Sequence, residues 1–88
     1  MIVTTKHGEF EVNDLTRKER RKHYRKVKDV FKSADVLLLH DLADEFALFA
    51  FNNPDEALKG LSATQEDEVL MDVINQYMGF DLKNASGD

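Results

Sequence analysis

One stretch constrains the fold more than any other: DVLLLHDLADEFALFAF, residues 35–51. Twelve of its seventeen residues are apolar. Six of them follow the spacing of one helical face: Leu39, Leu42, Ala43, Phe46, Ala47 and Ala50. Four more widen the apolar surface beyond that face: Leu38, Leu48, Phe49 and Phe51. Because a helix that is apolar around most of its circumference needs cover on several sides, we predict a central helix against which the other elements pack.

The same stretch does not predict a membrane span. A helix needs about 20 predominantly apolar residues to cross a bilayer, and this one is interrupted by Asp41, Asp44 and Glu45. The first residues, MIVTTKHGEF, have neither the basic nor the apolar region of a secretory signal. The sequence contains no cysteine, which excludes disulfides and is compatible with a reducing compartment. We therefore expect a cytoplasmic protein with no membrane partner.

Signals at the ends of the elements predict the rest of the layout. Residues 1–12 alternate β-prone and polar side chains around Gly8, which can adopt the positive φ of a turn, and so predict a β-hairpin. Thr16 followed three residues later by Glu19 predicts a capping box at a helix start. Pro54 marks another helix start, and a further cap lies at Ser62 or at Thr64.

These signals predict a mainly α fold with a short N-terminal β-hairpin, a small helical bundle packed round the central apolar helix. We expect a single domain over residues 1–80, with helices at about 16–32, 35–51, 54–59 and 64–78, and a fraying tail at 81–88. The hairpin is expected to lean on the helices through Ile2, Phe10 and Val12, because an isolated hairpin is marginally stable. The expected core is Phe10, Val27, Phe31, Leu38, Leu39, Leu42, Phe46, Val69, Leu70, Val73, Ile74 and Tyr77.

Charge is distributed unevenly along the chain. The formal net charge is −5, yet residues 1–32 carry ten Lys/Arg against five acids. Nine of those basic residues fall within residues 17–32. This basic helix can be a surface for assembly with a second copy or an acidic partner, a solvated face, or a site for a phosphate backbone. The acidic balance of the whole chain favours a protein partner over nucleic acid.

Aromatic residues form the second candidate surface. Phe46, Phe49 and Phe51 lie at helical spacing, which is most typical of a core. The short flanking elements can also leave part of the central helix uncovered, and such an apolar surface would suit a binding groove or an oligomer contact. The candidate partner-binding residues are therefore Arg17, Arg20, Arg21, Arg25, Lys28, Phe46, Phe49 and Phe51.

Catalytic and metal-binding patterns are lacking in the sequence. His40 and Asp44 lie one helical turn apart, but a metal centre needs three or four ligands. The chain has no glycine-rich phosphate loop, no HExxH and no nucleophile elbow. We therefore expect a protein that is not an enzyme and has no cofactor and no metal.

The layout resembles the tail assembly chaperones of long-tailed bacteriophages. The resemblance lies in LTRKERR at residues 15–21 after a short strand pair, an apolar helix, LSATQEDEVL at 61–70 and YMG at 77–79. It covers most of residues 8–80 and implies a small helical protein of the host cell cytoplasm. Such a chaperone binds the tape measure protein, or another tail component, and keeps it soluble during virion assembly.

The resemblance has further implications. Copies could stack head to tail on a long client, basic helix against acidic helix, and a frameshift near residues 81–88 could produce a longer form. Two other classes stay open: a phage or regulatory protein that binds a host protein through its acidic half, and a nucleic-acid-binding module that uses residues 17–32.

Overall fold

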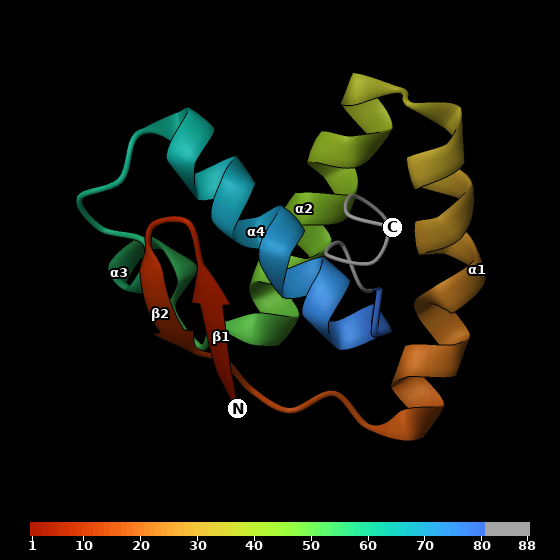
Figure 1. Ribbon diagram of the computed structural model, residues 1–88, viewed down its shortest axis with the longest axis horizontal. Helices are drawn as coiled ribbons and strands as arrows, with labels where there is room; N and C mark the ends of the chain where they lie inside the picture. The colour runs from red at the N-terminus through yellow and green to blue at the C-terminus, as the bar shows by residue number, and fades with distance from the viewer. Residues whose placement is uncertain (81–88) are drawn as a thin grey trace, which may run out of the picture.

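The computed structural model describes residues 1–80 (Figure 1), and the predicted fraying tail lies outside the described residues. Two strands and four helices follow one another in this range: β1 (Ile2–Thr5), β2 (Gly8–Glu11), α1 (Arg17–Ser33), α2 (Val36–Ala50), α3 (Pro54–Ala57) and α4 (Ala63–Met78). The hairpin and α1 lie at opposite sides of α2 and α4 in the view of Figure 1. The prediction of a mainly helical fold with an N-terminal hairpin is confirmed.

The hairpin is antiparallel and packs through β1 onto α4. Val3 stands opposite Phe10 in the register and is only 1% exposed. Successive strand residues point to opposite faces, so Ile2 points outward and is 56% exposed. The expectation that Ile2 leans on the helices is therefore wrong, whereas Val12 is buried as expected. Gly8 has a φ of +113° at the turn, in agreement with its predicted role.

Helix α1 begins at the predicted capping box. The Thr16 hydroxyl accepts a hydrogen bond from the Glu19 backbone N–H, and the Glu19 carboxylate accepts one from the Thr16 N–H. Two otherwise unpaired donors of the first turn are satisfied in this way. The helix buries Val27 and Val30, and it ends at Ala34, whose φ of 56° is left-handed.

Helix α2 is the central helix, and it packs chiefly against α4. Its buried side consists of Leu42, Ala43, Phe46, Ala47 and Ala50. The Asp35 carboxylate caps the helix by accepting hydrogen bonds from the N–H groups of the first turn. That turn follows directly on the C-terminal end of α1 (Figure 1). Leu38 is 44% exposed, so its predicted place in the core is wrong, whereas its neighbour Leu39 packs partly buried against the core.

The remaining predicted core is confirmed in most positions. The buried predicted residues are Val27, Leu42, Phe46, Val69, Leu70, Val73, Ile74 and Tyr77, and three others, Phe10, Phe31 and Leu39, pack partly buried against them. Helix α3 ends at Ala57, two residues before the predicted end, because the chain turns to bury Leu58. Helix α4 begins after Ser62, whose capping box with Gln65 decides between the two predicted caps.

Candidate functional site

The exposed side of α1 carries a row of basic residues. We call this set the basic stripe: Arg17, Arg21, Arg25, Lys28 and Lys32, all exposed. They recur at intervals of three or four residues, which places them on one side of a helix. The buried side of the same helix carries Val27 and Val30. The spacing that places Val27 and Val30 on the buried side of α1 also places four of the five predicted basic residues, together with Lys32, in one exposed row.

Within the described residues 1–80, the basic stripe makes no ion pair with another part of the protein. Within residues 1–80, the ion pairs of basic side chains involve Lys6, His7, His23, Lys26 and His40, and none involves the stripe. Five positive charges therefore face solvent along one helix of an otherwise acidic protein. A row of one sign produces a local potential that attracts an oppositely charged surface and speeds its association.

Arg20, the fifth predicted basic residue, does not belong to this surface. Its Nε donates to the carbonyl oxygen of Tyr77 at 3.1 Å, and its Nη2 donates to that of Met78 at 2.7 Å. The last carbonyls of a helix lack partners within the helix. Arg20 therefore caps the C-terminal end of α4, and its assignment to a partner-binding surface is wrong in this structure.

The predicted aromatic surface is also wrong in most of its members. Phe46 is fully buried and Phe51 is 5% exposed, so neither can contact a partner. Phe49 is half-buried, because the His23 ring of α1 packs on it with 5.1 Å between ring centroids.

The apolar residues of α2 that do reach solvent are aliphatic: Val36, Leu37, Leu38 and Leu48. The sequence spacing indicates this exposure for two of them, since residues 37 and 48 fall on the side of the helix opposite Phe46.

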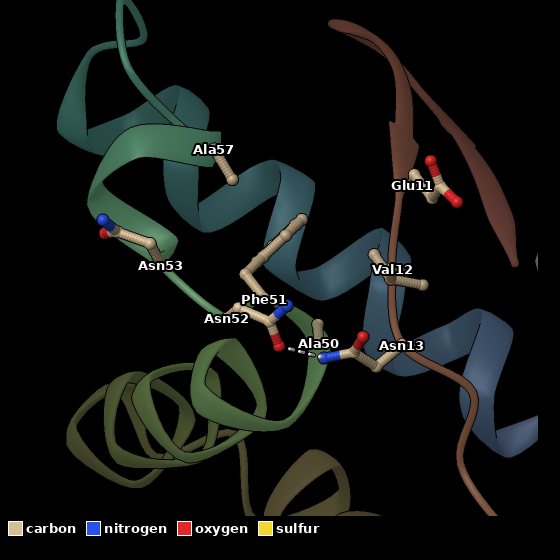
Figure 2. A pocket seen from close by; sticks show the side chains of 8 residues that line it. All are labelled: Glu11, Val12, Asn13, Ala50, Phe51, Asn52, Asn53 and Ala57. Atoms are coloured by element: carbon tan, nitrogen blue, oxygen red, sulfur yellow. Dashed lines mark hydrogen bonds between the residues drawn. The ribbon is translucent and has the colours of Figure 1, made fainter.

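A cavity of about 340 Å³ lies where the end of the hairpin meets α3 and the end of α2 (Figure 2). Asn13 lines this cavity. Its side-chain Nδ2 donates hydrogen bonds to the Phe49 carbonyl oxygen and to Oδ1 of Asn52, both at 3.2 Å. Among the described residues that line it, only Glu11 is titratable. General acid–base or nucleophilic chemistry needs a second group within hydrogen-bond reach, so this cavity is a structural junction.

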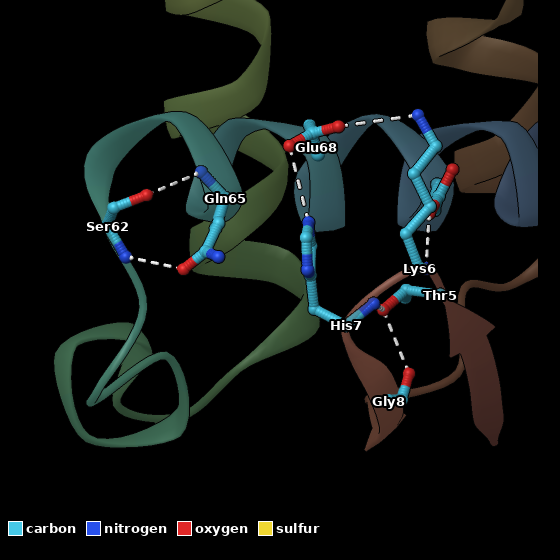
Figure 3. Close-up of polar contacts among 8 residues, drawn as sticks. Thr5, Lys6, His7, Gly8, Ser62, Gln65 and Glu68 are labelled. Carbon is cyan, nitrogen blue, oxygen red and sulfur yellow. Dashed lines mark hydrogen bonds and ion pairs between the residues drawn. The ribbon is translucent and has the colours of Figure 1, made fainter.

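Each of the three histidine side chains lies close to one carboxylate. His7 Nε2 lies 3.2 Å from the Glu68 carboxylate, and Lys6 Nζ lies 3.4 Å from it (Figure 3). Both hydrogen bonds lower the pKa of Glu68 below its usual value of 4.5, and the one with His7 has the larger effect. His40 Nε2 lies 3.7 Å from the Asp67 carboxylate, across the α2–α4 contact. No group of three His, Asp or Glu side chains in residues 1–80 is placed to hold a metal ion.

Two further findings concern the chain as a whole. Among the helices of residues 1–80, none has the length and apolar character needed to cross a membrane. Comparison of the chain with models of protein families, with curated proteins and with solved structures gives no match.

Proposed function

We propose that this chain is a non-enzymatic protein-binding module whose basic stripe binds an acidic surface of another protein. The observation that carries the proposal is the row of five exposed basic residues on α1, none of which forms an ion pair within residues 1–80. Basic charge near a helix start opposes the helix dipole and lowers helix stability slightly. Arg17 and Arg21 bear this cost without an ion pair to another side chain among residues 1–80, which favours a role in binding.

The chemistry of the stripe suits a helical or extended acidic partner. Arg side chains can bind carboxylates through two parallel hydrogen bonds. Three arginines lie on successive turns, so a partner with carboxylates at the same helical spacing could pair with each of them. The net charge of −5 repels nucleic acid from most of the molecule and leaves the stripe as the local attractive surface.

The resemblance to tail assembly chaperones gives the proposal a specific form. In that form the chain is a cytoplasmic chaperone of virion tail assembly, and its client is the tape measure protein encoded by the same genome. The stripe binds acidic stretches of the client, and the exposed aliphatic residues at the start of α2 cover apolar ones. Supporting this form are the mainly helical fold, the small size and the two exposed surfaces.

Co-expression with the tape measure protein tests the proposal. We expect the wild-type chain to raise the soluble fraction of the client several-fold, and the R21E/R25E/K28E variant to lose this effect. A K18E/K22E/K59E variant changes the net charge by the same amount at positions outside the stripe, and it should retain most of the activity. The proposal would be refuted if all three proteins raised the solubility of the client equally, or if none of them raised it.

A nucleic-acid-binding function is the second candidate, because the same stripe could lie along a phosphate backbone. It predicts binding to a short DNA or RNA duplex that weakens steeply between low and moderate salt. Absence of a fluorescence anisotropy change at low salt would exclude it. Binding that survives in R21E/R25E/K28E would exclude the stripe as the site.

A further inference from the structure

The side of α2 that faces away from the core has an unusual composition. We call it the α2 outer face: Leu37, Asp41, Asp44 and Leu48, at intervals of four, three and four residues. Leu37 and Leu48 are each 74% exposed, more than any other large apolar residue in the described range. The two aspartates between them are exposed as well. Apolar residues at both ends of an acidic centre form a surface with a distinct pattern along one helix.

Nothing in residues 1–80 covers this surface. The opposite side of α2 carries Leu42 and Phe46, which are buried against the rest of the core. The ion pairs of the described residues do not include Asp41 or Asp44. The neighbouring acid Glu45 does pair, with Lys26 and His23 of α1, because it lies on the side of α2 that faces α1. The α2 outer face is therefore both apolar and acidic, and it is unpaired within the described chain.

The basic stripe repeats the spacing of the α2 outer face. Arg21, Arg25, Lys28 and Lys32 also lie at intervals of four, three and four residues. Both sets therefore extend about 16 Å along a helix. When two such helices lie side by side, the two central positions of one set oppose the two central positions of the other, whichever way the helices run.

The residues at matching positions are complementary. The central carboxylates of Asp41 and Asp44 would oppose the central cations of Arg25 and Lys28. The end positions would place Leu37 and Leu48 against Arg21 and Lys32, whose long aliphatic stems can cover apolar surface while their charges stay in water. A charge pattern flanked by apolar contacts fixes the register of two helices better than charge alone.

We propose that a second copy of this chain occupies the α2 outer face, with the basic stripe of one copy docked on the α2 outer face of the next. The two surfaces belong to different helices, so the contact is head to tail and leaves one free stripe and one free outer face at the ends of each assembly. This inference rests on the proposed function in its use of the stripe as a binding surface. Self-association and client binding then compete for the stripe, and an acidic client disassembles the oligomer.

Light scattering of the chain alone tests the inference. We expect the molar mass to rise with protein concentration at low salt. It should fall to the monomer value at about 0.5 M salt, where the screening length is roughly 4 Å. A monomer at millimolar concentration and low salt would overturn the inference while leaving the client solubility test of the proposed function unaffected.

Reversing the charges of each surface in a separate variant, and then mixing the two variants, gives the sharper test. R25E/K28E and D41K/D44K should each be monomeric, because each places like charges opposite one another. Their equimolar mixture should associate again, since the reversed stripe of one variant matches the reversed outer face of the other. D55K/E56K, which reverses two exposed acids of α3, should associate like the wild type. A mixture that stays monomeric, or self-association of D41K/D44K at the wild-type level, would overturn the inference.

A variant without charge changes tests the apolar ends. L37S/L48S alters two side chains that are mostly in solvent, so its fold should be preserved, as judged by circular dichroism. We expect at least a tenfold weaker association for this variant at low salt. Unchanged association would show that the contact does not involve the α2 outer face.

Discussion

The Arg20 guanidinium donates a hydrogen bond to the backbone carbonyl oxygen of Met78, with 2.7 Å between Nη2 and the oxygen. A second bond from Nε reaches the carbonyl of Tyr77. These contacts join the first turns of α1 to the last turn of α4, and they place a positive charge where the α4 dipole is negative. Arg20 and Arg21 are neighbours in sequence, yet one stabilises the fold and the other belongs to the exposed stripe.

The first prediction separates these two arginines. R20Q removes two charge-assisted hydrogen bonds from the end of α4, so it should lower the free energy of unfolding by about 1–3 kcal/mol. R21Q changes an exposed residue without such contacts and should stay within about 0.5 kcal/mol of the wild type. Urea unfolding of both variants measures the difference. Equal stabilities for the two would contradict the capping role of Arg20.

The second prediction concerns Gly79, which ends α4 with a φ of +74°. A Cβ at this position would lie 3.0 Å from Nη2 of Arg20. G79A should therefore destabilise the protein by about 1–2 kcal/mol for the left-handed backbone, with an added cost for displacing Arg20. In an R20Q background the added cost disappears, so the two substitutions should be less than additive in a double-mutant cycle. Strict additivity would show that the two residues are not in contact.

The third prediction concerns stability at high pH. The buried Tyr77 hydroxyl donates to the backbone carbonyl of Asn13. Burial, with the carboxylates of Asp14 and Glu19, raises the pKa of Tyr77 from 10.0 to about 12. Unfolded Tyr77 therefore loses its proton at lower pH than folded Tyr77. Stability is fully present below pH 10 and falls as pH rises from there to about 12.

Y77F provides the measurement. The variant should be about 1 kcal/mol less stable near neutral pH, because the hydrogen bond to Asn13 is lost. Between pH 10 and 12 the wild type should lose up to about 1.4 kcal/mol per pH unit more than Y77F. Parallel stability curves for the two proteins across this range would contradict the raised pKa.

The fourth prediction concerns the hairpin turn and acid pH. Hydrogen bonds from His7 and Lys6 lower the pKa of Glu68, so their contribution to stability is present above pH 4.5 and is lost as pH falls through the lowered value. H7A should shift the Glu68 pKa toward 4.5 in an NMR titration. Glu19, whose pKa is lowered chiefly by Thr16, should titrate as in the wild type. A Glu68 pKa that is the same with and without His7 would refute this contact.

Features set by local chemistry could be predicted from the sequence. The capping box at Thr16 and the positive φ of Gly8 at the hairpin turn act within a few residues of their own elements, and each has its expected role. The apolar spacing of α2 and α4 identified most of the core, because burial of one helical side follows from that spacing alone.

Features that depend on contacts between distant elements could not be predicted. Arg20 has the same character in sequence as Arg21, and only the arrival of α4 beside it makes it a cap. Phe51 is buried beside Phe10 of the hairpin, with 6.4 Å between ring centroids, which spacing within α2 does not reveal.

An amide chemical-shift map of the labelled protein, titrated with a soluble fragment of the tape measure protein, would identify the surface that binds this proposed client. We expect the shifted amides to cluster on the exposed side of α1, around Arg17, Arg21, Arg25 and Lys28. We also expect that the same titration leaves the amides of R21E/R25E/K28E unchanged. Shifts confined to the hairpin and α3, or an unchanged spectrum of the wild-type protein, would contradict the claim that the basic stripe is the partner-binding surface.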